Sequence, residues 1–405
     1  MKKKYRIILY TSIFLLCVVA SIILVVKKSN SVYEEESKPK VVKHKSMLSM
    51  NLEQTAGAGD YKTVTQSGWP TEGYKFNTEL SRCENGSTLS WDDTKKAVIV
   101  SGNLSDKCYV YFDIYQPTLA EYIKSQYTGT QGENNIYYHD SDLANGAGDN
   151  SYRYAGANPN NFVCFGSDTS PCPTDNLYRI IGVFGENYHG VTGKQLVKLI
   201  KYDYMTTDEL GTDGDYSQTY KEWGMDSTYK GTYGDGERIG VYYWNYKATG
   251  SATNTWSTSL LNKTNLNTNF INYLGTTWAN KIATVTWKVG GNTWANIGTK
   301  TSSVAYTNEI TNPVTTNTTD NATTYSAKIG LMYVSDYGFA ASPDAWTLTM
   351  SSYNNTTATN NNWMYMGLYE WTISRNAGYS DNAFSVGNDG NVDIDRVNYN
   401  NGVRA

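Results

Sequence analysis

The chain of 405 residues is 40% hydrophobic and 18% charged and contains 35 Tyr and 11 Trp, a composition that excludes general disorder. Its net charge of −4 is uneven, because residues 1–48 carry ten Lys or Arg and three Glu, a local sum of +7 that leaves −11 on the remainder. Recognition of nucleic acid requires a basic face, so the acidic remainder argues against such a partner.

The first 28 residues predict a short cytoplasmic tail and a transmembrane anchor. Residues 7–26 contain no charged side chain, and about 20 apolar residues are enough to span a membrane as a helix. Four basic residues precede this run and Lys27 and Lys28 follow it. The larger cluster is expected to stay in the cytoplasm, which places the C-terminal part outside the cell. A cleaved signal peptide is the alternative, although its apolar core would be only about 7–15 residues long.

Residues 29–59 are charged, polar and without a clear period, so they predict a stalk between the membrane and the folded part. Residues 60–116 predict a small β module. Its strand-like runs "LSW", "AVIV" and "CYVYFDIY" are separated by the turn-like runs "DDTKK" and "GNLSDK".

The cysteines agree with an extracellular location. Cys17 lies inside the apolar run and is expected to be an ordinary apolar helix residue. The other four cysteines form an even set in an exported region, which favours disulfides. Proximity in the sequence predicts Cys83–Cys108 and Cys164–Cys172, although other pairings are open. Free thiols and a metal site are the alternatives, and a zinc site would need Cys or His at short paired spacings.

Residues 117–405 predict a larger second domain. Residues 118–127 have helical spacing with Thr118 as the N-cap. The runs "NFVCF", "LYRIIGVF" and "QLVKLIKY" predict an antiparallel meander, and residues 256–280 hold two helical stretches. Near the end, "AFSVG" and "VDIDRV" flank a turn at residues 388–391 that contains Asp-Gly, a strong hairpin signal. The fold class expected for the whole chain is therefore α+β and β-rich.

The elements "NLYRIIGVF", "KIGLMYVSDYGFA", "WMYMGLYEWTISR", "AFSVGNDGNV" and "GVRA" follow one another in this domain. In this order they resemble an uncharacterised domain family of exported proteins from low-GC Gram-positive gut bacteria. That family looks related to the C-type-lectin-like fold of formylglycine-generating enzymes and of the variable proteins of diversity-generating retroelements. The resemblance covers residues 117–405 and implies this fold there. The family has Pro and then a strand after Gly-Val-Arg, where this chain has Ala405, so we expect either a truncated last strand or a domain that closes differently.

The segment "EWTISRN", residues 370–376, could be a ligand site or a structural element. We expect a structural role, with Trp371 filling the core and Arg375 or Arg404 making a buried bridge to Glu370 or to an Asp. Arg suits such multidentate bridges. A ligand role for Trp371 and Arg375 is the alternative.

The hairpin offers a candidate calcium site. Calcium takes six to eight oxygen ligands, and carboxylate or amide oxygens gather at Asp389, Asn391, Asp393 and Asp395. A solvated hairpin without metal is the alternative. We expect no other cofactor.

Polar and aromatic residues after "EWTISRN" predict a ligand-binding face, because Tyr, Ser and Asn are the residues of adaptable binding surfaces. In the retroelement-diversified relatives that the resemblance implies, such residues line the binding face. The same bias runs through the whole chain, which is the compositional alternative. The residues of the predicted face are Asn376, Tyr379, Asp381, Asn382, Asn398, Tyr399 and Asn400.

The sequence predicts no catalytic residue, because it contains no nucleophile elbow, zinc-protease motif or phosphate loop. We therefore expect a membrane-anchored extracellular protein that binds a glycan, the cell wall or a protein at the cell surface. The alternatives are a cell-envelope enzyme whose active site the sequence does not locate, and a purely structural envelope protein.

Overall fold

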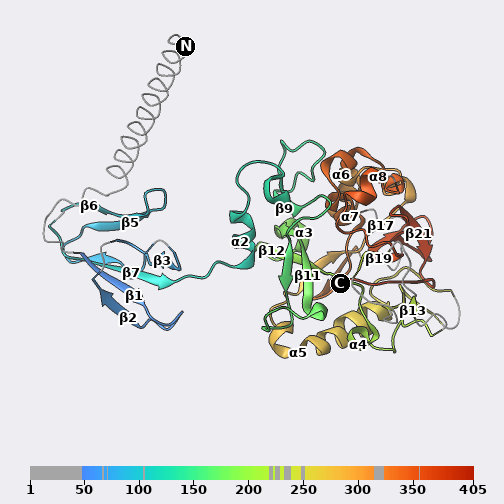
Figure 1. Cartoon of the computed structure of the whole chain (residues 1–405), viewed down its shortest axis with the longest axis horizontal. Helices are drawn as coiled ribbons and strands as arrows, with labels where there is room; N and C mark the ends of the chain where they lie inside the picture. The colour runs from blue at the N-terminus through green and yellow to red at the C-terminus, as the bar shows by residue number, and fades with distance from the viewer. Residues whose placement is uncertain are drawn as a thin grey trace, which may run out of the picture. The chain divides into compact units, whose positions relative to one another are not determined.

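The computed structural model describes residues 48–405 except for 66–67, 71, 104, 219–221, 224–228, 232–238, 248–250, 314–322 and 355. The predicted anchor at residues 7–26 and most of the predicted stalk lie outside the described residues. Within the described part of the chain, no helix is long and apolar enough to cross a membrane. The chain forms two compact units, Met1–Pro117 and Thr118–Ala405. The structure is mixed α+β with more strand than helix and several sheets, as predicted (Figure 1).

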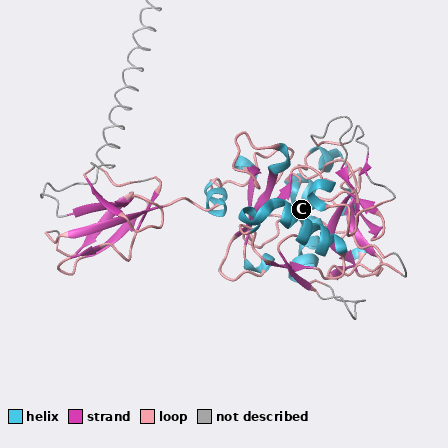
Figure 2. Cartoon of the chain, turned by 90° about the horizontal axis from the view of Figure 1, so that it is seen from below, coloured by secondary structure: helices cyan, strands magenta, loops and turns pink. Residues whose placement is uncertain are grey.

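The described part of the first unit consists of strands and loops (Figure 2). One sheet has the order β2-β1-β7-β3, with β4 also paired to β7, and β5 and β6 form a separate hairpin. The strands are β1 Leu48–Glu53, β2 Tyr61–Val64, β3 Tyr74–Phe76, β4 Arg82–Cys83, β5 Thr88–Asp92, β6 Ala97–Ser101 and β7 Cys108–Ile114.

Strand β1 corrects the predicted boundary of the stalk, which was placed over residues 29–59. Residues 48–52 pair in parallel with residues 108–112 of β7. Met50 and Leu52 are buried and pack in one cluster with Phe112. The β module therefore begins by residue 48 and not at residue 60. The parallel partner of β1, strand β7, lies about 60 residues further along the chain. Its antiparallel partner β2 follows directly after a turn at residues 54–60, most of which was assigned to the stalk.

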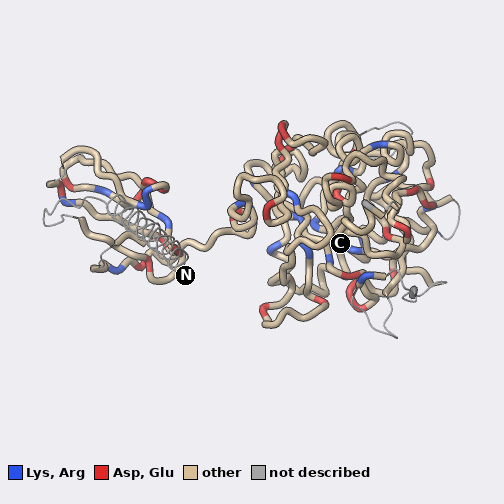
Figure 3. The backbone as a smooth tube through the Cα atoms, turned by 45° about the horizontal axis from the view of Figure 1, so that its top comes forward, with Lys and Arg blue, Asp and Glu red and all other residues tan. Residues whose placement is uncertain are grey.

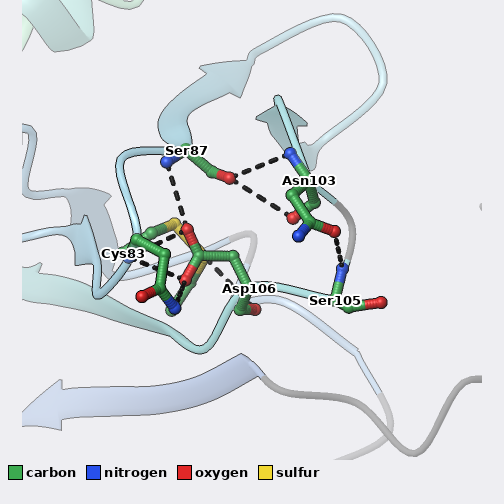
Figure 4. The surroundings of a disulfide bond; sticks show 7 residues. Cys83, Ser87, Asn103, Ser105 and Asp106 are labelled. Atoms are coloured by element: carbon green, nitrogen blue, oxygen red, sulfur yellow. Dashed lines mark hydrogen bonds between the residues drawn. A yellow bond between two sulfur atoms is a disulfide. The ribbon is translucent and has the colours of Figure 1, made fainter.

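Both predicted disulfides are present, Cys83–Cys108 and Cys164–Cys172. Cys83 and Cys108 stand opposite each other in the antiparallel pair of β4 and β7. The chain beside this bond is fixed by Asp106, whose carboxylate accepts a hydrogen bond from the backbone N–H of Ser87 at 3.1 Å (Figure 4). Disulfides persist in oxidising compartments, so the pair indicates an extracellular or periplasmic location.

The second unit holds the helices of the described chain. Helix α2 begins with the predicted cap, a capping box formed by Thr118 and Glu121. The π-helix η3 and helix α5 occupy the predicted helical region 256–280. The helices are α2 Leu119–Ser125, η1 Glu133–Asn135, η2 Thr174–Asn176, α3 Glu186–His189, α4 Thr207–Leu210, η3 Leu261–Phe270, α5 Ile271–Ala279, η4 Trp294–Asn296, α6 Ser302–Tyr306, η5 Thr307–Thr311, α7 Val334–Ala340, η6 Pro343–Thr347, η7 Met350–Ser352 and α8 Thr356–Asn360.

Strands β8 to β12 make the first sheet of this unit. β11 pairs antiparallel with β12 on one edge and with β10 and β9 on the other, and β9 pairs with β8. The predicted antiparallel arrangement of the three runs that became β10, β11 and β12 is confirmed. The strands are β8 Ile136–His139, β9 Ser151–Tyr154, β10 Phe162–Cys164, β11 Leu177–Phe184 and β12 Leu196–Lys201.

The second sheet has the order β17-β19-β20-β21 and contains the predicted hairpin of β20 and β21. Gly390 in its turn has a φ of +91°, which side chains rarely tolerate. Helix α7 contacts strands β19 and β20 of this sheet (Figure 1). The remaining strands are β13 Glu222–Trp223, β14 Ile239–Gly240, β15 Tyr242–Tyr243, β16 Val285–Lys288, β17 Gly291–Asn292, β18 Thr324–Ala327, β19 Glu370–Asn376, β20 Asn382–Val386, β21 Val392–Arg396 and β22 Asn400–Asn401.

Aromatic residues dominate the core of the second unit. Trp244, Trp256, Trp346 and Trp371 are fully buried. Trp244 packs on Trp256 with 4.9 Å between the ring centroids. Basic and acidic positions are interspersed along the chain in both units (Figure 3).

We predict that each disulfide stabilises the protein according to the loop that it closes. The bonds span 25 and 8 residues of sequence, so the chain-entropy relation gives about 3.5 kcal/mol for Cys83–Cys108 and about 2.5 kcal/mol for Cys164–Cys172. Urea unfolding of the two double Cys→Ala variants measures these losses. Peptide mapping of the unreduced protein should find both linked peptides, with Cys17 as the free thiol. Any other pairing would contradict the structure.

Candidate functional site

Strand β19 contains the residues for which the sequence predicts a structural role, and all seven of its residues are buried. The Arg404 guanidinium donates hydrogen bonds from Nε and Nη2 to the two carboxylate oxygens of Glu370, at 2.9 and 2.8 Å. The predicted buried salt bridge therefore joins Glu370 and Arg404, and not Arg375. Arg375 instead donates from Nε to the carbonyl oxygen of Val289 at 2.9 Å, and burial lowers its pKa to about 10.

Trp371 is also closed off from solvent, and its indole Nε1–H donates to the carbonyl oxygen of Tyr242 at 2.8 Å. A ligand at the protein surface cannot reach side chains that are buried to this extent. Trp371, Arg375 and Arg404 therefore fit the structural role better than the ligand role.

The three carboxylates of the predicted calcium site each accept hydrogen bonds within the hairpin or from residues beside it. Asp395 accepts hydrogen bonds from Ser385 Oγ at 2.6 Å and from Asn401 Nδ2 at 3.2 Å. Asp389 accepts from the backbone N–H of Asn391 at 3.1 Å, and Asp393 from that of Ile394 at 2.7 Å. The described chain holds no group of three His, Cys, Asp or Glu side chains that could bind a metal ion. These hydrogen bonds fix the hairpin, and the calcium site stays a prediction.

The residues of the predicted ligand face lie in two segments that the backbone brings together. The N–H of Val397 donates to the carbonyl oxygen of Asp381 at 2.8 Å. Tyr379 and Tyr399 are 60% and 51% exposed. Asn398 is exposed, and Asp381, Asn382 and Asn400 are half-buried. Asn376 is the exception, because it is only 1% exposed and its Oδ1 accepts from the N–H of Gly378 at 2.6 Å.

A third segment, residues 243–246, completes this surface. β15 pairs with β22, which places Tyr243 opposite Asn400, and the N–H of Asn245 donates to the carbonyl oxygen of Val397 at 3.1 Å. The rings of Tyr243 and Tyr246 stack with 4.6 Å between their centroids, and Tyr246 is 45% exposed. We name the surface formed by residues 243–246, 379–382 and 396–401 the tyrosine face.

The buried side chain of Asn254 forms hydrogen bonds with the backbone of the tyrosine face and of the strands beside it. It is fully buried, and its Nδ2 lies within hydrogen-bond distance of three carbonyl oxygens, those of Asn376 at 2.6 Å, Tyr379 at 3.0 Å and Asn382 at 2.7 Å. The backbone N–H of Asn254 also donates to the carbonyl oxygen of Ser380 at 2.6 Å. A buried donor group shared by three carbonyls fixes the loop without using any of its exposed side chains.

Sequence reasoning did not find Asn254 or Tyr246, because Asn254 and the segment 243–246 bond to residues more than 100 positions further along the chain. The aromatic run "VYYWNY" at residues 241–246 is a local signal for Tyr246. Asn254 stands in the polar run "GSATNT", in which nothing distinguishes it from its neighbours.

The structure also contains a pocket of about 770 Å³, which lies within the second unit and was not predicted. Residues of β10, β11, β12, η3, α5 and β16 line it, and most of its wall is apolar or aromatic. Phe165 and Trp278 meet edge to face there, with 5.1 Å between their ring centroids. Its volume falls in the range of about 300–1,000 Å³ that small-molecule sites occupy.

One charged network forms part of the wall of this pocket. Lys198 Nζ donates to Asp336 Oδ2 at 2.6 Å and to the hydroxyl of Tyr188 at 2.8 Å. The same amino group lies 4.4 Å from the ring centroid of Tyr333 and 4.9 Å from that of Trp287. Burial lowers the pKa of Lys198, and the nearby Asp336 opposes this shift. The sequence carries one signal for this arrangement, because Lys198 shares a strand face with the apolar Leu196 and Ile200.

The tyrosine face and the pocket have no residue in common. Comparison of the chain with protein-family models, with curated proteins and with solved structures gives no match.

We predict that Asn254→Ala destabilises the tyrosine face. The change removes a buried donor from three carbonyl oxygens, and each unsatisfied buried group costs about 1–3 kcal/mol. Asn158→Ala is the matched control, because Asn158 is exposed. Hydrogen exchange should accelerate at residues 378–382 in the Asn254 variant and stay unchanged in the control. Equal protection of this loop in both variants would show that Asn254 does not anchor it.

Proposed function

We propose that this protein is a membrane-anchored extracellular binding protein that attaches to a glycan through the tyrosine face. Three exposed tyrosines, Tyr246, Tyr379 and Tyr399, on a loop surface whose backbone is fixed, are the observation that carries this proposal. Aromatic rings provide large contact areas with little loss of side-chain entropy, and neighbouring amides provide hydrogen bonds. Asn398 and Asn400 are amides of this kind.

Other observations support the location and the fold that belong to this proposal. The apolar run at residues 7–26, with its basic flanks, supports a single-pass anchor. Both disulfides suit an extracellular compartment. The motif order from "NLYRIIGVF" to "GVRA" supports a C-type-lectin-like fold for the unit Thr118–Ala405, in which a binding face on the last strands is expected.

The binding prediction is tested on a glycan array with the full-length protein in detergent. Tyr379→Ala combined with Tyr399→Ala should weaken binding about a hundredfold, because each lost aromatic contact is worth roughly 1–1.5 kcal/mol. Tyr122→Ala is the control, since Tyr122 is 54% exposed but lies on α2. Chelation of calcium should leave binding unchanged. Failure to bind any glycan or wall fraction, or equal losses in variant and control, would refute the proposal.

The topology is tested by adding protease to intact cells that express the full-length chain. Residues after the anchor should be digested, because the basic cluster before residue 7 keeps the N-terminus in the cytoplasm. A known surface protein and a known cytoplasmic protein serve as controls. Survival of the second unit while the surface protein is cut would contradict an extracellular location.

A further inference from the structure

The pocket of about 770 Å³ has a mostly apolar and aromatic wall, and the charged side chains that line it are all positive. Phe165, Phe184, Trp278 and Trp287 belong to its apolar wall. The charged side chains among its described lining are those of four lysines, Lys194, Lys198, Lys281 and Lys328. His189 also lines the pocket, and burial lowers its pKa, so the imidazole is neutral at pH 7. A ligand that complements this lining has an apolar body and a negative charge.

The four lysines differ in how far they are already engaged. Lys198 is bound to Asp336 and Tyr188, and Lys328 donates to the carbonyl oxygen of Ala279. Lys194 and Lys281 are exposed, and neither forms an ion pair with a described residue. Lys281 Nζ lies 4.5 Å from the ring centroid of Trp278, which is itself part of the pocket wall. Lys194 and Lys281 are therefore the amino groups available to a ligand whose body contacts the aromatic wall.

We propose that this pocket binds a free long-chain fatty acid. Its hydrocarbon chain contacts the aromatic wall at Phe165, Trp278 and Trp287, and its carboxylate interacts with Lys194 and Lys281. Burial of each methylene contributes about 0.8 kcal/mol, so a chain that is two carbons longer binds about tenfold more tightly until the pocket is filled. Lys198 keeps its partner Asp336, whose carboxylate offsets its charge, so the ligand's carboxylate is left to Lys194 and Lys281. This site is independent of the proposed glycan binding, because it shares no residue with the tyrosine face.

The test uses the full-length protein in phosphatidylcholine nanodiscs and follows its tryptophan fluorescence. The probe is 11-bromoundecanoate, whose bromine quenches an indole that it contacts, and empty nanodiscs correct for partitioning. We expect saturable quenching that is lost when Trp278 and Trp287 are both changed to Phe. The neutral 11-bromoundecanol should bind about tenfold more weakly, as expected for the loss of a charge-assisted contact of roughly 1.5 kcal/mol.

A second set of variants tests the lysines. Lys194→Gln combined with Lys281→Gln should weaken the acid about tenfold and leave the alcohol unchanged, because only the acid carries a charge for these groups. Lys263→Gln is the matched control, since Lys263 is exposed and does not line the pocket. All three side chains are exposed, so the fold should be preserved.

Several results would overturn the proposal. One is the absence of quenching up to the solubility limit of the probe. Another is quenching that persists in the Trp278→Phe, Trp287→Phe variant, because the probe would then be bound elsewhere. Equal binding of acid and alcohol, or no effect of the lysine variants, would show that the pocket does not select an anion. If phosphatidylglycerol nanodiscs abolish quenching, a membrane lipid and not a free fatty acid occupies the site. Glycan binding by the same variants is measured in parallel, so failure here is distinguishable from failure of the proposed function.

Discussion

The second unit depends on one constraint, which is that strand β19 is buried along its whole length although most of its residues are polar. Buried polar groups are stable only when they have hydrogen-bond partners. Several partners of β19 come from distant parts of the chain: Arg404 binds Glu370, and the carbonyl oxygen of Tyr242 accepts from Trp371. These hydrogen bonds therefore join β19 to several segments that are remote in sequence. The segments joined in this way include Val289, Glu309, Phe384 and Met332.

Glu309 links β19 to helix α7, and α7 is in turn linked to β12 in the first sheet of the unit. It accepts from Ser374 Oγ, and it also accepts the backbone N–H groups of Val334 at 3.0 Å and Ser335 at 2.9 Å, which begin the helix. Burial raises the pKa of Glu309, and its hydrogen bonds to Ser335 and Ser374 oppose that rise. On the same first turn, Asp336 binds Lys198 of β12 at 2.6 Å. Helix α7 thus connects both sheets, because Glu309 joins its first turn to β19 and Asp336 joins it to β12. Lys198 and Tyr333, which take part in this connection, also line the pocket.

The sequence predicted the features whose causes are local. Helix α2 with its cap Thr118, the hairpin around Gly390 and the two disulfides each depend on residues close together in the chain. Features that depend on distant pairing were predicted poorly or not at all. Strand β1 was assigned to a stalk although its antiparallel partner β2 follows it closely, and its parallel partner β7 lies about 60 residues away. The two main segments of the tyrosine face were predicted, whereas its support by Asn254 and the pocket were not, because a pattern of residue types does not show which buried polar atoms or apolar walls meet in space.

The tyrosine face and the pocket differ in how much stability the protein loses when their side chains are substituted. At the tyrosine face, Asn254 binds backbone carbonyl oxygens, so the exposed side chains of Tyr379 and its neighbours carry none of the contacts that fix the loop. Substitution there alters a surface without removing a buried hydrogen bond. In the pocket, by contrast, Trp287 and Tyr333 are both wall and core, and their replacement removes packing as well as ligand contacts. A site that must change its specificity is therefore better placed on the tyrosine face, and a site with one constant ligand is better placed in the pocket.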